Sequence, residues 1–301
     1  MTPPALRILV TGATGQLGFE LARELAPFGH VVATDRTQLD LADPDSIVTA
    51  LRVHAPQVIV NAAAYTAVDQ AEREPERAHA INAIAPGILA DAAKRSGALL
   101  VHYSTDYVFD GRQADPYDED APTNPQNVYG RTKLEGERAI AHSGATALVF
   151  RTSWVYASRG RNFVLTMRRL ARERDELRVV ADQRGTPNWS RTLARASARL
   201  VAGGLPWLRE RAGLYHLTST GTTTWYDFAR AIVNDATANL SHDVAKPRVV
   251  PITTAQYPTP AARPANTALD GRRFAQAFGV ALPPCDDALA ECLSGIDDND
   301  A

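Results

Sequence analysis

The fold is decided near the N-terminus by the stretch Arg7-Ile-Leu-Val-Thr-Gly-Ala-Thr-Gly-Gln-Leu-Gly18. Its apolar residues Ile8–Val10 predict a strand, and Phe19–Leu25 predict a helix. The glycines between them predict a tight turn in which the backbone can approach a pyrophosphate, whose charge the helix N-terminus favours. Strand, glycine turn and helix together indicate a dinucleotide-binding unit, although the spacing is G-x2-G-x2-G rather than G-x-G-x2-G. A plain strand-to-helix turn is the alternative.

A second predicted strand, His30–Thr34, ends at an acidic residue. Asp35 lies 17 residues after Gly18, and an acidic side chain at such a position can accept a hydrogen bond from the adenosine ribose. Arg36 beside it suits a 2′-phosphate, because a guanidinium binds phosphate oxygens with paired hydrogen bonds. The two side chains leave the choice between NADH and NADPH open.

A second motif lies in a predicted helix farther along the chain. Tyr129 and Lys133 are four residues apart, so both side chains lie on one helix face. A free phenol has a pKa of about 10 and exchanges protons poorly near neutrality, but a nearby cation favours the phenolate and lowers that pKa. The pair is therefore a candidate general acid or base for interconverting a carbonyl and an alcohol. A solvated helix face is the alternative, and the nucleotide motif favours the catalytic interpretation.

Composition bounds the possible function classes. The chain has 301 residues, of which 45% are hydrophobic and 22% charged, and a net charge of −2. These values are typical of a globular protein without a basic surface for nucleic acid. No apolar run approaches the roughly 18 residues of a membrane-spanning helix, and no leader peptide is evident, so we expect a cytoplasmic protein. Cys285 and Cys292 are expected to be reduced.

Strands and helices alternate along the first half, which predicts an α/β fold. The expected strands are Ile8–Val10, Val31–Thr34, Val58–Asn61, Leu99–Tyr103 and Ala147–Arg151. The expected helices are Gln16–Leu25, Pro44–His54, Pro75–Arg95 and Val128–His142. Such alternation gives a Rossmann-type, doubly wound parallel sheet with helices on both faces. Ligands bind such sheets at the carboxyl ends of the strands, where Asn61, Ser104-Thr-Asp106 and Thr152-Ser-Trp154 fall.

The pattern becomes irregular after Trp154. The later elements are expected to be a helix (Asn162–Arg174), a strand (Arg178–Val180), a turn-rich stretch (181–190), a strand (Leu214–Leu217), a helix from Trp225, and loop-like or extended segments at Val249–Ile252 and Pro258–Pro264. We therefore expect a dinucleotide-binding domain at 1–155, to which some later segments return. A smaller, partly interleaved C-terminal substrate-binding lobe at 156–295 and an acidic tail at 296–301 would follow.

Six runs of sequence carry a family resemblance. They are Thr11-Gly-Ala-Thr-Gly-Gln-Leu-Gly18, Val60-Asn-Ala-Ala-Ala-Tyr-Thr-Ala-Val-Asp69, His102-Tyr-Ser-Thr-Asp-Tyr-Val-Phe-Asp-Gly111, Asn127-Val-Tyr-Gly-Arg-Thr-Lys-Leu-Glu-Gly136, Phe150-Arg-Thr-Ser-Trp-Val-Tyr156, and Gly213-Leu-Tyr-His-Leu217 with Gly221-Thr-Thr-Thr-Trp225. The first and fourth runs are generic to a superfamily, the extended short-chain dehydrogenase/reductases. The others are more specific, and with them nearly the whole chain closely resembles the dTDP-4-dehydrorhamnose reductase family.

The resemblance implies roles for individual residues. Tyr129 would protonate the C4 oxygen of a keto sugar as hydride arrives from the nicotinamide, Lys133 would hold the nicotinamide ribose and lower the Tyr129 pKa, and Thr105 would hydrogen-bond the same sugar oxygen. The implied binding residues for NADPH or NADH are Gly12, Gly15, Gln16, Leu17, Gly18, Asp35, Arg36, Asp40, Leu41, Ala62, Ala63, Ala64, Tyr129 and Lys133. The implied substrate-binding residues are Thr66, Val68, Ser104, Thr105, Asp106, Tyr107 and Trp154.

Two features separate this chain from similar proteins. Related 4,6-dehydratases carry an Asp-Glu pair after the threonine, whereas Tyr107 cannot act as that carboxylate base, which favours simple reduction. Some family members bind magnesium at a dimer interface through glutamates, and the matching positions here are Glu20, Arg191 and Glu291. An arginine brings positive charge to a site that needs oxygen ligands. We therefore expect no magnesium, Arg191 paired with Glu20 or Glu291, and a monomer or a homodimer with another interface.

The resemblance implies NAD(P)H-dependent reduction of dTDP-4-dehydro-6-deoxy-L-mannose to dTDP-L-rhamnose, a step of cell-surface polysaccharide biosynthesis. Two alternatives remain open. One is reduction of another 4-keto-6-deoxy sugar nucleotide. The other is a non-catalytic, cofactor-binding subunit similar to the regulatory β subunit of methionine adenosyltransferase. The intact set of Thr105, Tyr129 and Lys133 favours an enzyme.

Overall fold

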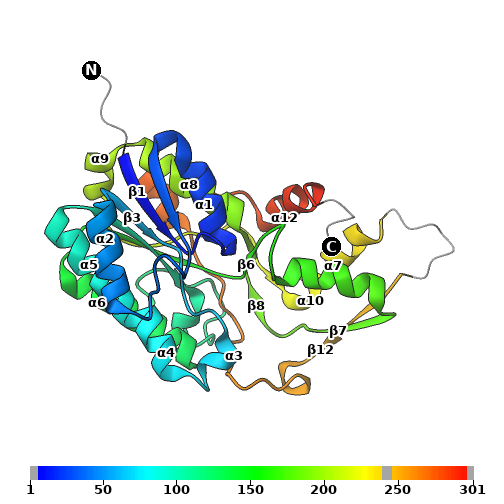
Figure 1. Ribbon diagram of the computed structural model, residues 1–301. Coiled ribbons are helices and arrows are strands. Elements are labelled where there is room, and N and C mark those ends of the chain that lie inside the picture. Colours follow the sequence, from blue (N-terminus) through cyan, green and yellow to red (C-terminus); the bar gives the residue numbers. More distant parts are fainter. Residues whose placement is uncertain (1–5, 239–245, 297–301) are drawn as a thin grey trace.

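A parallel sheet forms the larger half of the molecule (Figure 1). The computed structural model describes residues 6–238 and 246–296, so the expected acidic tail lies outside the described residues except for Ile296. Within these ranges the sheet has six strands, in the spatial order β10 (Gly213–His216), β5 (Ala147–Thr152), β4 (Leu99–Thr105), β3 (Val58–Asn61), β1 (Leu6–Thr11) and β2 (Gly29–Thr34). The five strands expected in the first half are all present, and the doubly wound, Rossmann-type fold is confirmed.

Helices cover both faces of this sheet (Figure 1). One face carries α1 (Gln16–Leu25), α8 (Ser190–Ala202), α9 (Leu205–Arg209) and α11 (Arg272–Phe278), and the other carries α2 (Pro44–His54), α5 (Ala85–Ser96) and α6 (Val128–Ser143). Consecutive strand residues enter opposite cores, as Val10 does under α1 and Leu9 under α2, because side chains alternate along a strand. Burial on both faces explains why these strands are continuous apolar runs.

The expected helix Pro75–Arg95 is interrupted. A π-helical turn, η2 (Ala80–Ile84), separates α4 (Pro75–His79) from α5. Its buried Asn82 accepts a hydrogen bond from the Tyr65 backbone at 2.8 Å and donates to the Thr132 hydroxyl at 3.2 Å. The turn thus ties α6 to the segment after β3. Sequence periodicity did not reveal it, because the residues on both sides keep a helical pattern.

A smaller second lobe lies beside the sheet (Figure 1). Its elements are β6 (Val155–Tyr156), α7 (Phe163–Glu173), β7 (Glu176–Val180), β8 (Arg184–Gly185), β9 (Asn188–Trp189), β11 (Thr223–Thr224), α10 (Trp225–Ala236), β12 (Arg248–Ile252) and α12 (Cys285–Ser294). The short remaining segments are η1 (Ala26–Phe28), α3 (Val68–Ala71), η3 (Asp106–Val108) and η4 (Thr254–Gln256). No helix in the described ranges has the length and apolar character needed to cross a membrane.

One segment of this lobe differs from the sequence expectation. Val249–Ile252, expected to be loop-like or extended, belongs to the strand β12, which pairs in parallel with β7 over Arg248–Ile252. Pro251 weakened the strand signal because proline cannot donate a ladder hydrogen bond. In this two-stranded sheet β12 has a free edge that tolerates it. Pro258–Pro264 has no helix or strand, as expected.

Helix α1 rests directly on the glycine turn. A Cβ added to Gly18 would lie 2.1 Å from the Gly12 carbonyl oxygen, so only glycine allows this approach. Gly12 itself has a φ of +69°, a left-handed conformation in which glycine is favoured. The turn and the helix start are therefore one rigid unit.

Gly18→Ala is expected to lower the free energy of unfolding by about 1–3 kcal/mol, because the methyl group forces α1 away from the turn. Gly87→Ala on α5 is the matched control, since its Cβ would meet only the Ala139 Cβ at 3.3 Å. In a helix interior alanine is more favourable than glycine by up to about 1 kcal/mol. The free energy of unfolding of Gly87→Ala should therefore be unchanged or higher than that of the native protein. Urea unfolding measures both, and a Gly18→Ala protein as stable as the native one would contradict the close contact.

Candidate active site

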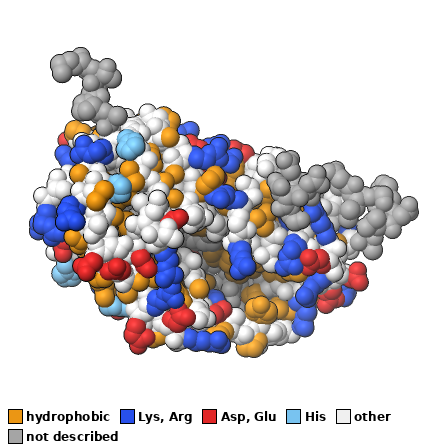
Figure 2. All heavy atoms as spheres, in the orientation of Figure 1, with side chains coloured by type: hydrophobic (Ala, Val, Ile, Leu, Met, Phe, Trp, Pro, Cys, Tyr) orange, Lys and Arg blue, Asp and Glu red, His pale blue; other side chains and the backbone are white. Residues whose placement is uncertain are grey.

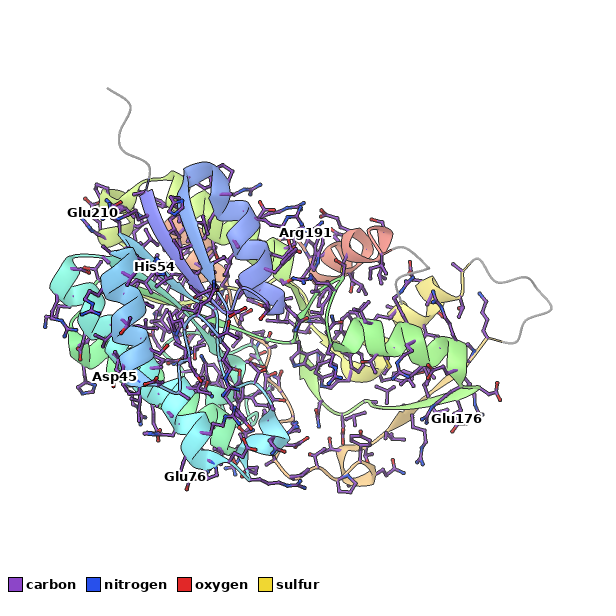
Figure 3. The ribbon with its side chains drawn as sticks, in the orientation of Figure 1. Asp45, His54, Glu76, Glu176, Arg191 and Glu210 are labelled. Carbon is purple, nitrogen blue, oxygen red and sulfur yellow. The ribbon has the colours of Figure 1, made fainter. Side chains whose placement is uncertain are left out.

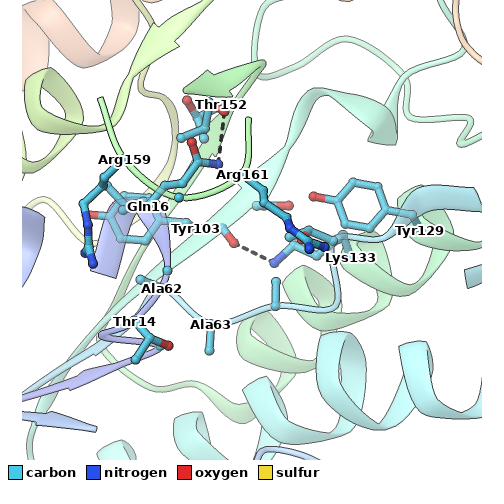
Figure 4. Close-up of a pocket in the computed structure, with 18 residues that line it drawn as sticks. Thr14, Gln16, Ala62, Ala63, Tyr103, Tyr129, Lys133, Thr152, Arg159 and Arg161 are labelled. Carbon is cyan, nitrogen blue, oxygen red and sulfur yellow. Dashed lines mark hydrogen bonds between the residues drawn. The ribbon is translucent and has the colours of Figure 1, made fainter. Parts of the chain in front are cut away.

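A pocket of about 440 Å³ opens where β1, β3 and β4 end (Figure 4). Its lining comes from the turn after β1, the segment after β3, one face of α6 and the loop after β6: Gly12, Thr14, Gly15, Gln16, Leu17, Ala62, Ala63, Ala64, Thr66, Tyr103, Ser104, Tyr129, Lys133, Thr152, Val155, Arg159, Gly160 and Arg161. The strand order reverses between β1 and β3, and doubly wound sheets bind ligands at such a switch point. Figure 2 shows the molecule hollowed between the sheet and the second lobe.

The lining brings together many of the residues that the sequence singled out. Those that lie outside it are Gly18, Asp35, Arg36, Asp40, Leu41, Val68, Thr105, Asp106, Tyr107 and Trp154. Gly18 packs against the glycine turn, because its Cα lies directly beside the Gly12 carbonyl.

The glycine turn and the segment after β3 form a narrow cradle. A Cβ added to Gly12 would come within 3.0 Å of Ala63, and one added to Gly15 would lie 3.2 Å from the Gly12 carbonyl oxygen. Gln16 Oε1 and Thr152 Oγ1 belong to residues that line the pocket, and both atoms are buried without a hydrogen-bond partner. A turn whose glycines have no side chains, at the N-terminus of α1, fits the pyrophosphate of a dinucleotide.

The end of β2 lies beside the turn, because Ala13 N–H donates to the Thr34 carbonyl at 3.0 Å. The Asp35 carboxylate accepts from the Thr37 hydroxyl at 2.6 Å and the Thr37 backbone at 2.8 Å, and these bonds lower the Asp35 pKa. One carboxylate oxygen is therefore engaged in its own turn.

The neighbouring predicted residues are held by other groups. Arg36 pairs with Asp40 at 3.3 Å on the surface. Leu41 is buried in the core beneath α2. Asp40 and Leu41 thus shape the loop after β2. The Arg36 side chain is 65% exposed and its charge is paired at the surface with Asp40.

Tyr129 is presented to the pocket by the first turn of α6. Asn127 caps this helix by accepting from Gly130 N–H at 2.8 Å. Burial raises the pKa of Tyr129 to about 12, a hydrogen bond with the Thr105 hydroxyl opposes this, and the charge of Asp106 raises the pKa further. The phenol is therefore protonated near neutrality, which is the state that a proton donor requires.

Lys133 is also buried on α6, one turn farther on. Its Nζ donates to the Tyr103 carbonyl oxygen at 2.6 Å and lies 3.2 Å from His102 Nε2 (Figure 4). Burial lowers the pKa of Lys133 to about 8, and Glu137 opposes this. Burial dominates the Tyr129 pKa and raises it, and the expected lowering of that pKa by Lys133 stays a prediction.

Ser104 contributes to the pocket wall, but its hydroxyl is directed elsewhere. It donates to Glu137 Oε1 at 2.5 Å. The same carboxylate accepts from Arg151 Nε at 2.9 Å and from Arg151 Nη2 at 2.7 Å. All three side chains are buried. This ion pair fastens α6 to β4 and β5, and it leaves the Ser104 hydroxyl unavailable as a donor to a sugar.

The remaining predicted substrate residues surround Tyr129. The Tyr107 ring meets the Tyr129 ring edge to face, with centroids 5.8 Å apart. Thr105 donates to the Asp106 carboxylate at 2.9 Å. Burial raises the pKa of Asp106 to about 7, and its second oxygen is buried without a partner. Val68 begins the short helix α3.

Trp154 is more constrained than the sequence indicated. Its φ is +44°, in the left-handed region. Its indole stacks on Trp225 with centroids 3.6 Å apart and an interplanar angle of 7°. A Cβ added to Gly185 would lie 2.5 Å from this ring. Trp225 therefore covers one face of Trp154, and that face is closed to a sugar.

Sequence reasoning missed the arginines of the loop after β6. Arg159 and Arg161 line the pocket (Figure 4), and Arg159 lies over the Phe19 ring at 3.6 Å. Among the described residues that line the pocket there is no carboxylate, so its charge is positive. The run Arg159-Gly160-Arg161 was the sequence signal that could have revealed them, because guanidinium groups bind diphosphates well.

The positions compared with a magnesium site do not fit a metal. Buried Glu20 accepts from Arg191 Nε at 3.1 Å, at the junction of α1 and α8 (Figure 3). Glu291 pairs with Arg195 at 2.7 Å. Arg191 thus pairs with Glu20, as expected, whereas the partner of Glu291 was not predicted. Within the described ranges no group of three His, Cys, Asp or Glu side chains could hold an ion.

A parallel sheet, a glycine turn at its switch point and a Tyr–Lys pair in the same pocket are the arrangement of a nicotinamide-dependent dehydrogenase or reductase. Comparison with known proteins narrows this class. Residues 6–297 match the family model described as the RmlD substrate binding domain. The chain therefore belongs to the RmlD family.

The most similar relatives include proteins named dTDP-4-dehydrorhamnose reductase. That of Burkholderia thailandensis is 48% identical over 298 residues, which are 97% of this chain and 99% of the relative. That of Escherichia coli is 47% identical over 283 residues, which are 92% and 94%. The crystal structure of dTDP-4-dehydrorhamnose reductase from Bacillus anthracis in complex with NADP has a TM-score of 0.88 and 34% identity, covering 96% of this chain and 99% of that one.

Asp106→Asn is expected to remove part of the pH dependence of folding stability. Burial raises the pKa of Asp106 to about 7 in the fold, against roughly 3.9 in an unfolded chain. The fold holds this proton more tightly, so the stability that Asp106 contributes is full at low pH and is lost as the pH rises through 7. Between pH 5 and pH 8 the variant should gain on the order of 2 kcal/mol over the native protein.

Urea unfolding at the two pH values measures this gain. Asp287→Asn, on the exposed side of α12, controls for the loss of a carboxylate. A parallel pH dependence of the native protein and Asp106→Asn would show that Asp106 is ionised in the fold throughout this range.

Proposed function

We propose that this chain reduces the C4 keto group of dTDP-4-dehydro-6-deoxy-L-mannose to give dTDP-L-rhamnose, with NADPH or NADH as the hydride source. The observation that carries the proposal is the match to the RmlD family over residues 6–297, together with a pocket that holds both the glycine turn and the Tyr129–Lys133 pair. The named activity of the relatives and the bound NADP of the Bacillus anthracis structure support it.

The cofactor would lie along the floor of the pocket. The glycine turn and the N-terminus of α1 would hold its pyrophosphate, and small side chains at Ala62–Ala64 would let the nicotinamide approach. Asp35 or Arg36 would hold the adenosine ribose or its 2′-phosphate. Lys133 would bind the nicotinamide ribose hydroxyls. When bound, the cofactor supplies a hydride to C4 of the sugar.

The chain itself handles the proton and the developing charge. Tyr129 would donate its phenolic proton to the C4 oxygen as negative charge develops there. Thr105 would donate a hydrogen bond to the same oxygen after its hydroxyl proton, which the Asp106 carboxylate accepts in this structure, turns toward the sugar. Burial of the ring keeps Tyr129 protonated, and an ionised Asp106 acts in the same direction, which suits the direction of reduction.

The residues around Tyr129 favour reduction over elimination of water. Elimination needs a carboxylate base beside the sugar, and Tyr107 follows Asp106 where related dehydratases have that base. The described residues that line the pocket include no carboxylate. Arg159 and Arg161 add positive charge that suits the diphosphate of a sugar nucleotide.

The surroundings of the enzyme are part of the proposal. We infer that the enzyme is cytoplasmic, because it consumes a reduced nicotinamide cofactor. We also infer that it acts on a dTDP-sugar and binds no nucleic acid, because its net charge of −2 is typical of a protein without a basic surface. We infer a monomer, or a homodimer whose interface is not bridged by magnesium. The pairing of Glu20 with Arg191 supports this inference.

Tyr129→Phe should bind NADPH normally but turn over about 10²–10⁴-fold more slowly, because the proton donor is removed. The assay follows nicotinamide absorbance after addition of dTDP-4-dehydro-6-deoxy-L-mannose. Tyr215→Phe is the control, since its hydroxyl donates to the Arg211 carbonyl outside the pocket. A near-native rate for Tyr129→Phe would show that another group donates the proton. A native protein that binds NADPH but reduces no 4-keto sugar nucleotide would favour the non-catalytic subunit.

Arg36→Ala should weaken NADPH binding on the order of tenfold or more, the cost of a charge-assisted hydrogen bond, and should change NADH binding little. The reason is that only NADPH carries the 2′-phosphate. Arg52→Ala, an exposed arginine at the end of α2, is the control for loss of surface charge. The dissociation constants of both cofactors are measured for each variant. An equal loss of affinity for NADPH and NADH in Arg36→Ala would show that Arg36 does not bind the 2′-phosphate.

A further inference from the structure

Residues 258–264, here called the crossing segment, carry the chain from the second lobe back to the sheet domain. They follow β12 and η4, and the trace passes beside α3 (Figure 1). The crossing segment has no helix or strand, and none of its residues lines the pocket. The reduction described above does not use it, yet it is fastened to two segments that lead into the active site.

Asp69 of α3 holds the crossing segment on one side. Its Oδ1 accepts from Ala261 N–H at 3.2 Å and pairs with Arg263 Nη2 at 2.9 Å. Arg263 also donates to the Ala261 carbonyl oxygen at 3.1 Å. Carboxylate, guanidinium and backbone thus form one cluster of contacts, and this part of the crossing segment is fixed against α3.

Asn127 of α6 holds the crossing segment on the other side. Its Nδ2 donates to the Ala262 carbonyl at 2.9 Å, and its Oδ1 accepts from Gly130 N–H at 2.8 Å. The side chain is 2% exposed. The reversed amide would set NH₂ against N–H and oxygen against oxygen, so the two contacts fix its orientation. Serine or aspartate would cap the helix equally well, and capping alone therefore does not explain an asparagine here.

The next residue of α6 closes the arrangement into a triangle. Val128 N–H donates to Glu72 Oε1 at 2.7 Å, and Glu72 directly follows α3. The α3 segment thus holds the crossing segment through Asp69, the crossing segment holds α6 through Asn127, and α6 returns to the α3 segment through Val128. Each of the three segments is fastened to the other two.

Tyr129 is the residue that follows these contacts. The Glu137–Arg151 pair fastens α6 about two turns farther on, so it sets where the helix lies and leaves its first turn to other contacts. That turn also packs closely on η3, because a Cβ added to Gly130 would lie 2.2 Å from the Tyr107 carbonyl oxygen. A shift of the first turn would therefore move the Tyr129 ring.

We propose that Asn127 is a positioning residue for Tyr129: it docks the crossing segment on the first turn of α6 and thereby places the phenol for proton transfer. The inference rests on the proposed function in one respect, which is that Tyr129 is the proton donor. Because the crossing segment continues from β12, the same contact holds the second lobe and the proton donor in one arrangement.

Asn127→Ser tests this role, because serine keeps the helix cap but is too short to reach the Ala262 carbonyl. Its kcat with dTDP-4-dehydro-6-deoxy-L-mannose should fall roughly 10–100-fold, the range expected of a small misplacement. The dissociation constant of NADPH should stay native, because the glycine turn is unchanged, and this measurement also confirms that the variant is folded. A native kcat in folded Asn127→Ser would overturn the proposal.

Asp69→Ala releases the other side of the crossing segment and is the second variant, since its exposed position tolerates substitution. Its kcat should also fall, and the double variant should lose less than the product of the two single effects, because both act through one segment. Glu173→Ala on α7, which removes an exposed carboxylate paired with Arg169 at 2.7 Å, is the control and should keep the native kcat. Two effects that multiply would overturn the proposal.

NMR of protein labelled with ¹³C on its nine tyrosines gives a readout that needs no turnover. The Tyr129 ring signal is the one lost in Tyr129→Phe. It should shift in Asn127→Ser and stay unchanged in Glu173→Ala, whereas an unchanged signal in Asn127→Ser would overturn the proposal. A native protein that oxidises no cofactor with the keto sugar would reject the proposed reduction, and the NMR comparison would still decide whether Asn127 places the Tyr129 ring.

Discussion

Three neighbouring strands, β1, β3 and β4, are held in a parallel register that pairs Thr11 with Asn61 and Asn61 with His102. Because of this register the glycine turn, the alanine segment and Thr105 all emerge at one edge of the sheet. Helix α6 is fastened to the same edge by the buried Glu137–Arg151 pair. The distance between the cofactor cradle and Tyr129 is thus set by the sheet, and not by flexible loops.

Burial decides the electrostatics of the site. It raises the pKa of Tyr129 to about 12 and of Asp106 to about 7, and it lowers that of Lys133 to about 8. Each shift favours the neutral form of the group. A protonated phenol suits reduction, in which it gives up a proton to a developing oxyanion. The positive charge that a sugar diphosphate needs comes instead from the exposed Arg159 and Arg161 at the mouth of the pocket.

The sequence predicted what depends on local pattern. Helix α1 was predicted to the residue, since the glycine turn and the apolar period of its helix define both ends. Contacts between distant segments were not predictable in this way. The Trp154–Trp225 stack joins residues 71 positions apart, and the sign of the Tyr129 pKa shift depends on burial that no local motif specifies. The resemblance predicted that Arg191 pairs with Glu20 or Glu291, because an aligned position carried the opposite charge, and the structure shows the pair with Glu20.

The central claim is that the keto sugar and the nicotinamide meet between the glycine turn and Tyr129. The most direct measurement is a crystal structure of the chain with NADP⁺ and dTDP-L-rhamnose. In that structure the sugar C4 is expected within about 3–3.5 Å of the nicotinamide C4, as a near-attack arrangement requires, with the C4 hydroxyl hydrogen-bonded to Tyr129 and Thr105. A sugar bound away from Tyr129, or a nicotinamide turned out of the pocket, would contradict it.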